Sequence, residues 1–460
     1  MPVVDRRDFG GRFSVKENSQ RLANYRYLEI QLMEMIGGWS HTTPQLAFKA
    51  TFGYHVYDHA RAADALGERL EQLRSGRDRQ EPATDDFARL CEHVWNLEDT
   101  IARLVAVYRV LEPHLVSTYV YHADATDPMT DTPTVRLLHG LAGQAQSHVA
   151  WGHAVLDSLT ASPEDRRRAV EVQADIEARL VECGGVTGQG IESHWLAFAS
   201  ARADAKPPER HKRGRSGYRF EKRCAPLDHP VVEEPFWWSD DPEEFRRIYH
   251  ADDEWSLEGF RHKFHQLLYG EVETTDRMGK IIAEFPDLPW ELRMGFANQM
   301  WDEARHIEIV AKVCEDELAA ELGYGPWSLV WWWMQNEDDP LKRIAVTNSW
   351  AEANLMQTLR QWREHAEERG YARIAELCDY LQADELNHVK LATEWIRRLT
   401  ADDEERRREL VRWGVQAVAR IEGFYADDDY EPPGEDEVRF TFLKEGGARA
   451  SRSHAAVIGE

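Results

Sequence analysis

The sequence Asp-Glu-x-x-His occurs twice in this chain, as D-E-A-R-H at 302–306 and as D-E-L-N-H at 384–388. Each copy lies in a run rich in Ala, Leu, Glu and Arg, whose apolar residues recur every three or four positions, as is typical of an α-helix. Residues three apart in a helix lie on the same face, one turn from each other. Glu and His at this spacing can therefore reach one point, and both residue types bind metal ions. The chain must fold so that two such helix faces can meet.

Helical periodicity extends over most of the sequence, and few stretches alternate apolar and polar residues as a strand would. We therefore predict an all-α fold. In the first half, caps and turn residues indicate helices over 19–37, 44–75, 84–120, 132–160 and 163–183. The second half repeats this layout over 253–284, 288–321, 339–369 and 371–399, with a last helix over 402–423.

The length of 460 residues is too great for one ordinary core. A basic stretch at 206–223 followed by a proline-rich stretch separates the two helical blocks. We therefore predict an N-terminal helical domain over 1–200, a linker over 201–236, a second helical domain over 237–424 and an acidic, extended C-terminal tail over 425–460.

The charge and the cysteine content of the chain restrict the partners and the cellular compartment that we expect for this protein. A net charge of -26 opposes non-specific binding to nucleic acid or to an anionic membrane. The five cysteines are scattered without a C-x-x-C pair, which argues against a disulfide framework and a cysteine zinc site. The first residues lack the apolar core of a signal peptide, and the longest apolar run, 328–334, is too short to span a bilayer. We expect a cytoplasmic protein with no membrane partner.

Two further glutamates extend the repeated motif. Glu271 precedes Glu303 by 32 residues, and Glu352 precedes Glu385 by 33. Antiparallel helices joined by tight turns would bring the middles of all four helices together. Four carboxylates buried at one point repel one another unless cations neutralise them, and two divalent ions balance four negative charges. The predicted metal ligands and catalytic residues are Glu271, Glu303, His306, Glu352, Glu385 and His388. Carboxylate and imidazole ligands favour iron or manganese.

This pattern resembles the ferritin-like di-iron carboxylate proteins, in which two helices each supply one Glu and two others each supply a Glu-x-x-His pair. D-E-A-R-H also resembles the Asp-Glu-x-Arg-His hallmark of di-iron monooxygenases and ribonucleotide reductase small subunits, and D-E-L-N-H differs from it only in having Asn387 at the Arg position. In that family the Asp before the ligand Glu holds a ligand histidine. The resemblance implies this role for Asp302 and Asp384.

Residues 255–400 resemble a poorly characterised ferritin-like branch that carries F-P-D-x-P-W-E between its first two helices. That branch has His-Glu at the first ligand, whereas this chain has Gly270-Glu271, with Glu273 as a rival ligand two positions later. Two residues at this spacing point about 160° apart on a helix, so we expect only one of them to face the core. The spacing favours Glu271.

The first half can be aligned with the second. Laying 145–159 on 385–399 pairs His148 with His388 and puts Ala145 at the position of Glu385. Laying 55–66 on 302–313 pairs His59 with His306 and puts Val56 at the position of Glu303. The alignment predicts two ferritin-like four-helix units in tandem, with the dinuclear site in the second. Because the first unit lacks both bridging glutamates, we expect it to be a degenerate unit whose metal site has decayed.

The residues of the first half leave two interpretations open. Its buried histidines can be packed and hydrogen-bonded core residues, which is the commoner case. They can also form a different metal site, for which the candidates are Glu29, His55, Asp58, His59 and His148.

The resemblance implies a di-iron oxygenase or oxidase that uses O₂ to hydroxylate, N-oxygenate or desaturate a small organic substrate. Two iron ions are the expected cofactor, with manganese or a mixed pair also open. A ferredoxin or flavin reductase is the implied electron donor, and a homodimer is left open. The alternatives are a ferroxidase or peroxide-scavenging protein, an RNA-base hydroxylase that uses the basic segment 206–223, and a noncatalytic interaction protein with a structural metal pair.

Overall fold

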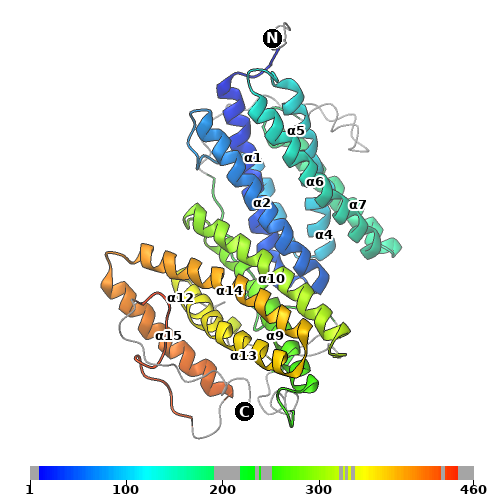
Figure 1. The fold of residues 1–460 in the computed structure, drawn as a ribbon. Helices are drawn as coiled ribbons and strands as arrows, with labels where there is room; N and C mark the ends of the chain where they lie inside the picture. The colour runs from blue at the N-terminus through cyan, green and yellow to red at the C-terminus, as the bar shows by residue number, and fades with distance from the viewer. Residues whose placement is uncertain are drawn as a thin grey trace, which may run out of the picture. The chain divides into compact units, whose positions relative to one another are not determined.

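The structure is a computed structural model that describes residues 10–190, 218–233, 238–239, 251–320, 325–326, 330–332, 337–425 and 430–443. Its regular structure there is almost entirely helical, which confirms the all-α class (Figure 1). One short parallel pairing joins β1 (Trp238–Ser239) to β2 (Gly325–Pro326). The chain divides into two compact units, Met1–Met35 with His55–Lys222 and Ile36–Tyr54 with Arg223–Glu460. Residues 36–54 are thus grouped with the second half, whereas the predicted N-terminal domain contains them.

The helices of the first half follow the predicted layout except over 84–120. Helices α1 and α2 are joined through the 3₁₀ turn η1, and a π-helical segment, η2, connects α4 to α5. The elements are α1 (Val15–Trp39), η1 (Ser40–Thr42), α2 (Leu46–Gln72), α3 (Asp85–Trp95), α4 (Thr100–Leu104), η2 (Val105–Leu111), α5 (Glu112–Ala125), α6 (Thr132–Leu159) and α7 (Pro163–Glu182).

The prediction of one helix over 84–120 is wrong, because two polar side chains interrupt it. Helix α3 ends at Trp95, where the Asn96 side chain donates to the Glu92 carbonyl (2.9 Å). Asp99 then accepts a hydrogen bond from the Ala102 amide (2.9 Å) and caps α4. Asn and Asp side chains compete for backbone groups in this way and so favour helix ends over helix interiors.

The second half contains four long helical segments and a final helix. The third segment is continuous over α12, the π-helical segment η3 and α13, as predicted for 339–369. The elements are α9 (Leu257–Glu284), α10 (Trp290–Asp316), α12 (Pro340–Val346), η3 (Thr347–Glu352), α13 (Ala353–Arg369), α14 (Ala372–Leu399) and α15 (Glu404–Tyr425). Gly370 ends α13 with a left-handed φ of 78°, a conformation that glycine adopts without steric cost.

Helix α9 is held in place by residues of the segment 36–54. The Lys49 ammonium lies 2.7 Å from Asp276 Oδ2 and donates to the Ser40 carbonyl (2.7 Å), and the Ser40 hydroxyl also donates to Asp276. Three residues further along α9, the backbone approaches Gly37 so closely that a Cβ added to Gly279 would lie 2.2 Å from the Gly37 carbonyl oxygen. The buried ion pair and the glycine contact fix the helix that carries Glu271.

The apolar core of the second unit lies mainly between α9, α10, α13 and α14. It combines aromatic and aliphatic side chains, and its members include Phe260, Phe264, Leu268, Val310, Leu359, Trp362 and Leu381. Burial of this apolar surface supplies the main driving force for packing the segments together.

The chain after α15 has no regular helix or strand over 430–443, but it is not loosely ordered. Phe440 and Phe442 are buried, and the Arg397 side chain donates to the Phe442 carbonyl (3.0 Å). The rest of the predicted tail, and most of the predicted linker and basic segment, including 206–217, lie outside the described residues.

No helix in the described part of the chain is both long and apolar enough to cross a membrane.

Replacement of Gly279 by Ala should destabilise the second unit, because the added methyl group has no room against the Gly37 backbone. We expect a loss of about 1–3 kcal/mol, the usual cost of overpacking. Gly270→Ala is the matched control in the same helix, since a Cβ there meets nothing within 4 Å and Ala favours helix. Urea unfolding of both variants checks this, and equal midpoints would contradict the close approach.

Candidate dinuclear metal centre

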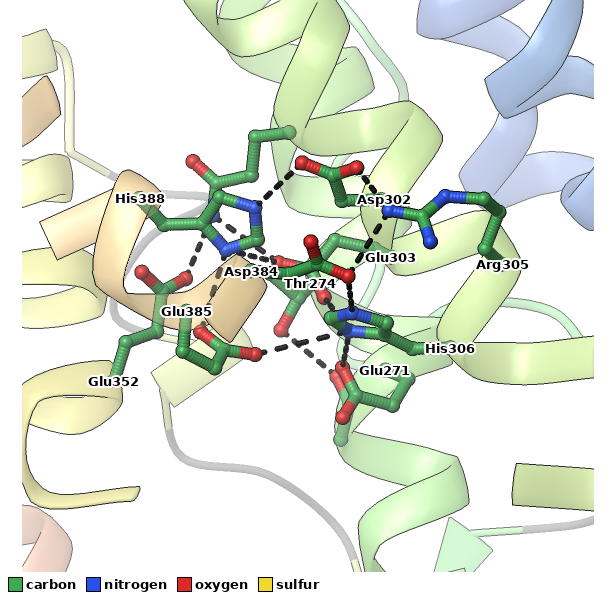
Figure 2. A network of polar contacts seen from close by, with 12 residues as sticks. Glu271, Thr274, Asp302, Glu303, Arg305, His306, Glu352, Asp384, Glu385 and His388 are labelled. Carbon is green, nitrogen blue, oxygen red and sulfur yellow. Dashed lines mark hydrogen bonds and ion pairs between the residues drawn. The ribbon is translucent and has the colours of Figure 1, made fainter. Parts of the chain in front are cut away.

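The structure brings all six predicted ligands together in the interior of the second unit (Figure 2). All six side chains are buried, and they come from four helical segments. They are Glu271 on α9, Glu303 and His306 on α10, Glu352 at the end of η3, and Glu385 and His388 on α14.

The six side chains form two overlapping groups of four. One group contains Glu271 and His306, and the other contains Glu352 and His388. Both groups include Glu303 and Glu385, and the potential ligand atoms within each group lie within 4.8 Å of one another. Two adjacent ions could therefore share two carboxylates and each take one histidine and one further glutamate.

The Glu-x-x-His spacing has the expected local effect. His306 Nδ1 lies 3.2 Å from Glu303 Oε2, and His388 Nδ1 lies 3.3 Å from Glu385 Oε2. One turn of helix thus places each imidazole beside the carboxylate of its own motif. In both histidines the Nδ1 atom faces the carboxylate cluster.

Asp302 and Asp384 hold the far sides of the two imidazoles, but each contacts the histidine of the other motif. His388 Nε2 lies 3.2 Å from Asp302 Oδ2, and His306 Nε2 lies 3.2 Å from Asp384 Oδ2. A carboxylate at this position fixes the tautomer and orientation of a ligand histidine. The contacts agree with the role that the resemblance implied, and they also link α10 to α14.

A single arginine serves both motifs. Arg305 Nη2 donates to Asp384 Oδ2 (3.0 Å) and also to Asp302. Asn387, which replaces arginine in the second motif, is exposed and donates only locally, to the Ala383 carbonyl (3.3 Å). Arg305 therefore reaches across to the aspartate of the second motif, which has no arginine of its own.

Both candidate first ligands are buried, so the expectation that only one would face the core is wrong. Only Glu271 reaches the cluster, where its Oε2 lies 3.5 Å from His306 Nδ1. Glu273 lies 3.7 Å from the Arg277 guanidinium, one turn further along α9. Helix α9 is buried on more than one face, which is why both glutamates are inside.

Glu352 is the last residue of the π-helical segment η3. A π-helical turn contains one residue more than an α-helical turn, and such turns are frequent at functional sites. The Ser349 carbonyl in this segment accepts a hydrogen bond from the Thr441 amide of the C-terminal segment (3.2 Å). The packed part of the tail therefore satisfies a backbone group of the segment that presents Glu352.

Sequence reasoning missed two buried amides beside the cluster. Gln299 Nε2 donates to Glu352 Oε1 (2.6 Å) and to Glu303 Oε1 (3.2 Å). Asn348 donates in turn to Gln299 Oε1 (2.8 Å). Each amide stands four residues before a predicted ligand, on the same helix face, and this spacing is the signal that could have revealed them.

The acidic side chains differ in how readily they ionise. Burial, followed by the charge of Glu303, raises the pKa of Glu271 well above its usual value. Burial, followed by the charge of Glu385, does the same to the pKa of Glu352. Burial also opposes ionisation of Glu303, but the charge of His388 and the charge and hydrogen bond of His306 together outweigh it and lower the pKa of Glu303 to about 2. Burial and the neighbouring carboxylates thus both favour the protonated forms of Glu271 and Glu352.

The neighbouring carboxyl groups raise the pKa values of the two histidines and so favour their charged forms. Burial disfavours the charged form of His306, yet the neighbouring Glu271 carboxyl raises its pKa well above the usual value. The same competition between burial and the Glu303 charge raises the pKa of His388. Without another cation, protons on these groups must compensate the negative charge.

The donor set fits a pair of divalent ions. Glu271 Oε1 and Glu352 Oε2 are buried and have no hydrogen-bond partner within the described part of the chain. Buried carboxylate oxygens of this kind are costly unless a cation or a donor satisfies them. The two atoms belong to different groups of four, one for each predicted ion.

The region that contains the cluster is similar to a known protein family. Residues 241–424 match a family described as a protein of unknown function (DUF455). The matched range includes all six predicted ligands as well as Asp302 and Asp384. No curated protein and no solved structure matches the chain.

Removal of the outer carboxylate from either histidine should weaken metal binding. We expect Asp302→Asn and Asp384→Asn each to lower affinity for divalent ions by about 10–100-fold, the usual effect of losing such a contact. Asp316→Asn is the control, because Asp316 lies on the same helix as Asp302 but pairs with exposed Lys312. Competitive titration with a chelator measures the affinities, and unchanged values for both variants would remove the two aspartates from the site.

The raised pKa values predict how pH affects metal-free protein. Glu271 and Glu352, with usual values of 4.5, and His306 and His388, with usual values of 6.5, carry extra protons when folded. A group with a raised folded-state pKa loses its stabilising contribution as the pH rises past the unfolded-state value. We expect the free energy of unfolding to fall between pH 7 and 9, by roughly 1.4 kcal/mol per pH unit for each group that keeps its proton.

Urea unfolding with excess chelator at several pH values tests this expectation. Saturating manganese(II) should reverse the slope, because metal ligands must lose their protons to bind. Metal-free stability that rises between pH 7 and 9 would contradict the charge distribution described above.

Proposed function

We propose that the second unit is a ferritin-like four-helix bundle with a dinuclear iron centre. The protein would use this centre as an O₂-dependent oxidoreductase acting on a small organic molecule. One observation carries the proposal, namely that two groups of four ligands share Glu303 and Glu385. Two adjacent ions are held together by carboxylates that both of them bind. A set of unrelated salt bridges would not need such shared carboxylates.

The residues of the chain would control the centre in three ways. Asp302 and Asp384 orient the two histidines, and Gln299 holds two of the glutamates at fixed positions. Val272, which follows Glu271, and Ile307, which follows His306, belong to the buried apolar core and would help to keep water out of the centre. A dry site strengthens every electrostatic contact within it.

When bound, two iron(II) ions supply the electrons and open coordination positions for reaction with O₂. Manganese could replace one or both ions, because these ligands suit either metal. Repeated turnover needs an external electron donor, for which a ferredoxin or a flavin reductase has suitable chemistry. The reaction would hydroxylate, N-oxygenate or desaturate its substrate.

The tandem arrangement is part of the proposal. The first unit would be a second bundle of the same kind, because its helices also bring buried histidines and glutamates together. Most of the basic segment 206–223, on which the RNA-base alternative depends, lies outside the described residues.

Loss of the shared glutamates should remove two ions. We expect the double variant Glu303→Ala/Glu385→Ala to bind two divalent ions fewer per chain than the wild type, because both groups of four lose two members. Glu376→Ala, at an exposed position of α14, is the matched control and should keep the wild-type stoichiometry. Metal analysis after iron(II) loading and desalting measures the difference. An unchanged metal content in the double variant would refute the ligand assignment.

O₂ consumption separates the proposed function from a ferroxidase. An oxygenase without its reductant should consume O₂ only until the centre is oxidised, after two iron equivalents per chain. Oxygen uptake that continues in proportion to added iron(II), and that is lost in the double variant, would instead indicate that iron is the substrate.

A further inference from the structure

A second cluster of metal-binding side chains lies in the first unit, and the proposed function does not use it. His59 on α2, Glu112 at the start of α5 and His148 on α6 are all buried. One potential ligand atom from each lies within 4.8 Å of the other two. Glu112 is fully buried, with 0% of its surface exposed, and such a charge needs a compensating partner.

The two histidines converge on one carboxylate oxygen. His59 Nε2 lies 3.0 Å from Glu112 Oε1, and His148 Nδ1 lies 3.1 Å from the same atom. Neighbouring ligand atoms around a tetrahedral ion with bonds of about 2.0–2.1 Å lie roughly 3.3 Å apart. The other oxygen, Glu112 Oε2, is buried and has no hydrogen-bond partner in the part of the chain that is described. The spacing of the ligand atoms is therefore close to that of a tetrahedral site, and one carboxylate oxygen beside them is unsatisfied.

Outer carboxylates hold the far side of each imidazole. His59 Nδ1 lies 2.6 Å from Glu29 Oε2, and His148 Nε2 lies 3.0 Å from Asp58 Oδ2. The Tyr119 hydroxyl donates to the other oxygen of Glu29. Carboxylate, imidazole and metal ion in series are the usual arrangement around ligand histidines, and the second unit has the same arrangement through its two aspartates.

His55 is not part of the ligand set, although the sequence made it a candidate. Its Nδ1 lies 2.7 Å from the Tyr108 hydroxyl, and its ring packs on His148 with 4.0 Å between the ring centres. Of the sequence candidates, His59 and His148 therefore face the centre of the cluster. Glu29 and Asp58 lie on the outer side of these histidines. Glu112, which was not among those candidates, lies at the centre.

The two units share further details that support a common design. Glu112 precedes His148 by 36 residues, and Glu352 precedes His388 by the same 36. Glu112 directly follows the π-helical segment η2, and Glu352 ends the π-helical segment η3. The equivalence of Glu112 and Glu352 follows from both observations.

The shared design lacks the residues that would bridge two ions. Val56 and Ala145, which align with the two shared glutamates, are buried and cannot bind a metal. Only one ion can be accommodated.

We propose that the first unit binds a single divalent transition-metal ion through His59 Nε2, Glu112 and His148 Nδ1. Two histidines and one carboxylate on one side leave other coordination positions open, a set that suits iron(II), cobalt(II) or zinc(II). The nitrogen atoms that face Glu112 must carry no proton when the ion binds. Each ring then keeps its proton on the nitrogen that faces Glu29 or Asp58.

Cobalt(II) titration of the full chain tests the site, because cobalt reports its ligands by visible absorption. Glu303→Gln/Glu385→Gln serves as the background that removes the second centre. We expect this background to bind one cobalt ion per chain, and the further change Glu112→Gln to weaken that binding at least 100-fold. His153→Gln is the matched control, since His153 is exposed on the same helix as His148. Asp58→Asn should weaken binding by about 10–100-fold.

Far-UV circular dichroism and the thermal midpoint establish that each variant is folded. A folded background that binds no cobalt, or equal binding with and without Glu112→Gln, would overturn the proposal. Failure of the dinuclear centre gives a different result. In that case the wild type and the background would bind the same single ion, and Glu112→Gln would remove it from both.

Discussion

The burial of four carboxyl groups and two imidazoles at one point is the constraint on which the second unit depends. Four buried negative charges would oppose folding strongly if nothing neutralised them. Protons can provide part of the compensation, as the raised pKa values of Glu271 and Glu352 indicate. Two divalent ions can provide all of it. The proposed ions would therefore compensate the charge of the cluster more completely than protons do.

The surrounding structure holds this cluster from several directions. The crossed contacts of Asp302 and Asp384 join the two motif helices, and Arg305 neutralises both aspartates. Gln299 ties the third helical segment to α10 through Glu352. Each contact limits the freedom of one of the six side chains, so the cluster has the preorganised geometry that the proposed ions would require.

The first unit offers a variation on the same plan. Its cluster keeps two histidines and one glutamate, while Val56 and Ala145 occupy the positions of the shared glutamates. Apolar residues at these two positions lower the charge that must be neutralised, in agreement with the proposed single ion. The two units thus contain clusters of different charge, and we propose that they differ in the number of ions that they bind.

Local pattern alone determined much of this protein. Helical periodicity predicted the all-α class and most helix limits, because the apolar face of a helix is encoded at short range. The spacing in Glu303-x-x-His306 and Glu385-x-x-His388 identified ligand candidates for the same reason. The break at Asn96 and Asp99 was not recognised, since capping by a side chain competes with helix propensity over only a few residues.

Contacts between distant segments were decided only by the tertiary structure. The choice between Glu271 and Glu273, the crossed pairing of each aspartate with the other motif and the position of Gln299 all depend on how one helix is rotated against another. The central place of Glu112 in the first unit depends on a π-helical turn that shifts the register of its helix. Helix rotation and register follow from packing of the whole unit, so no short stretch of sequence contains them.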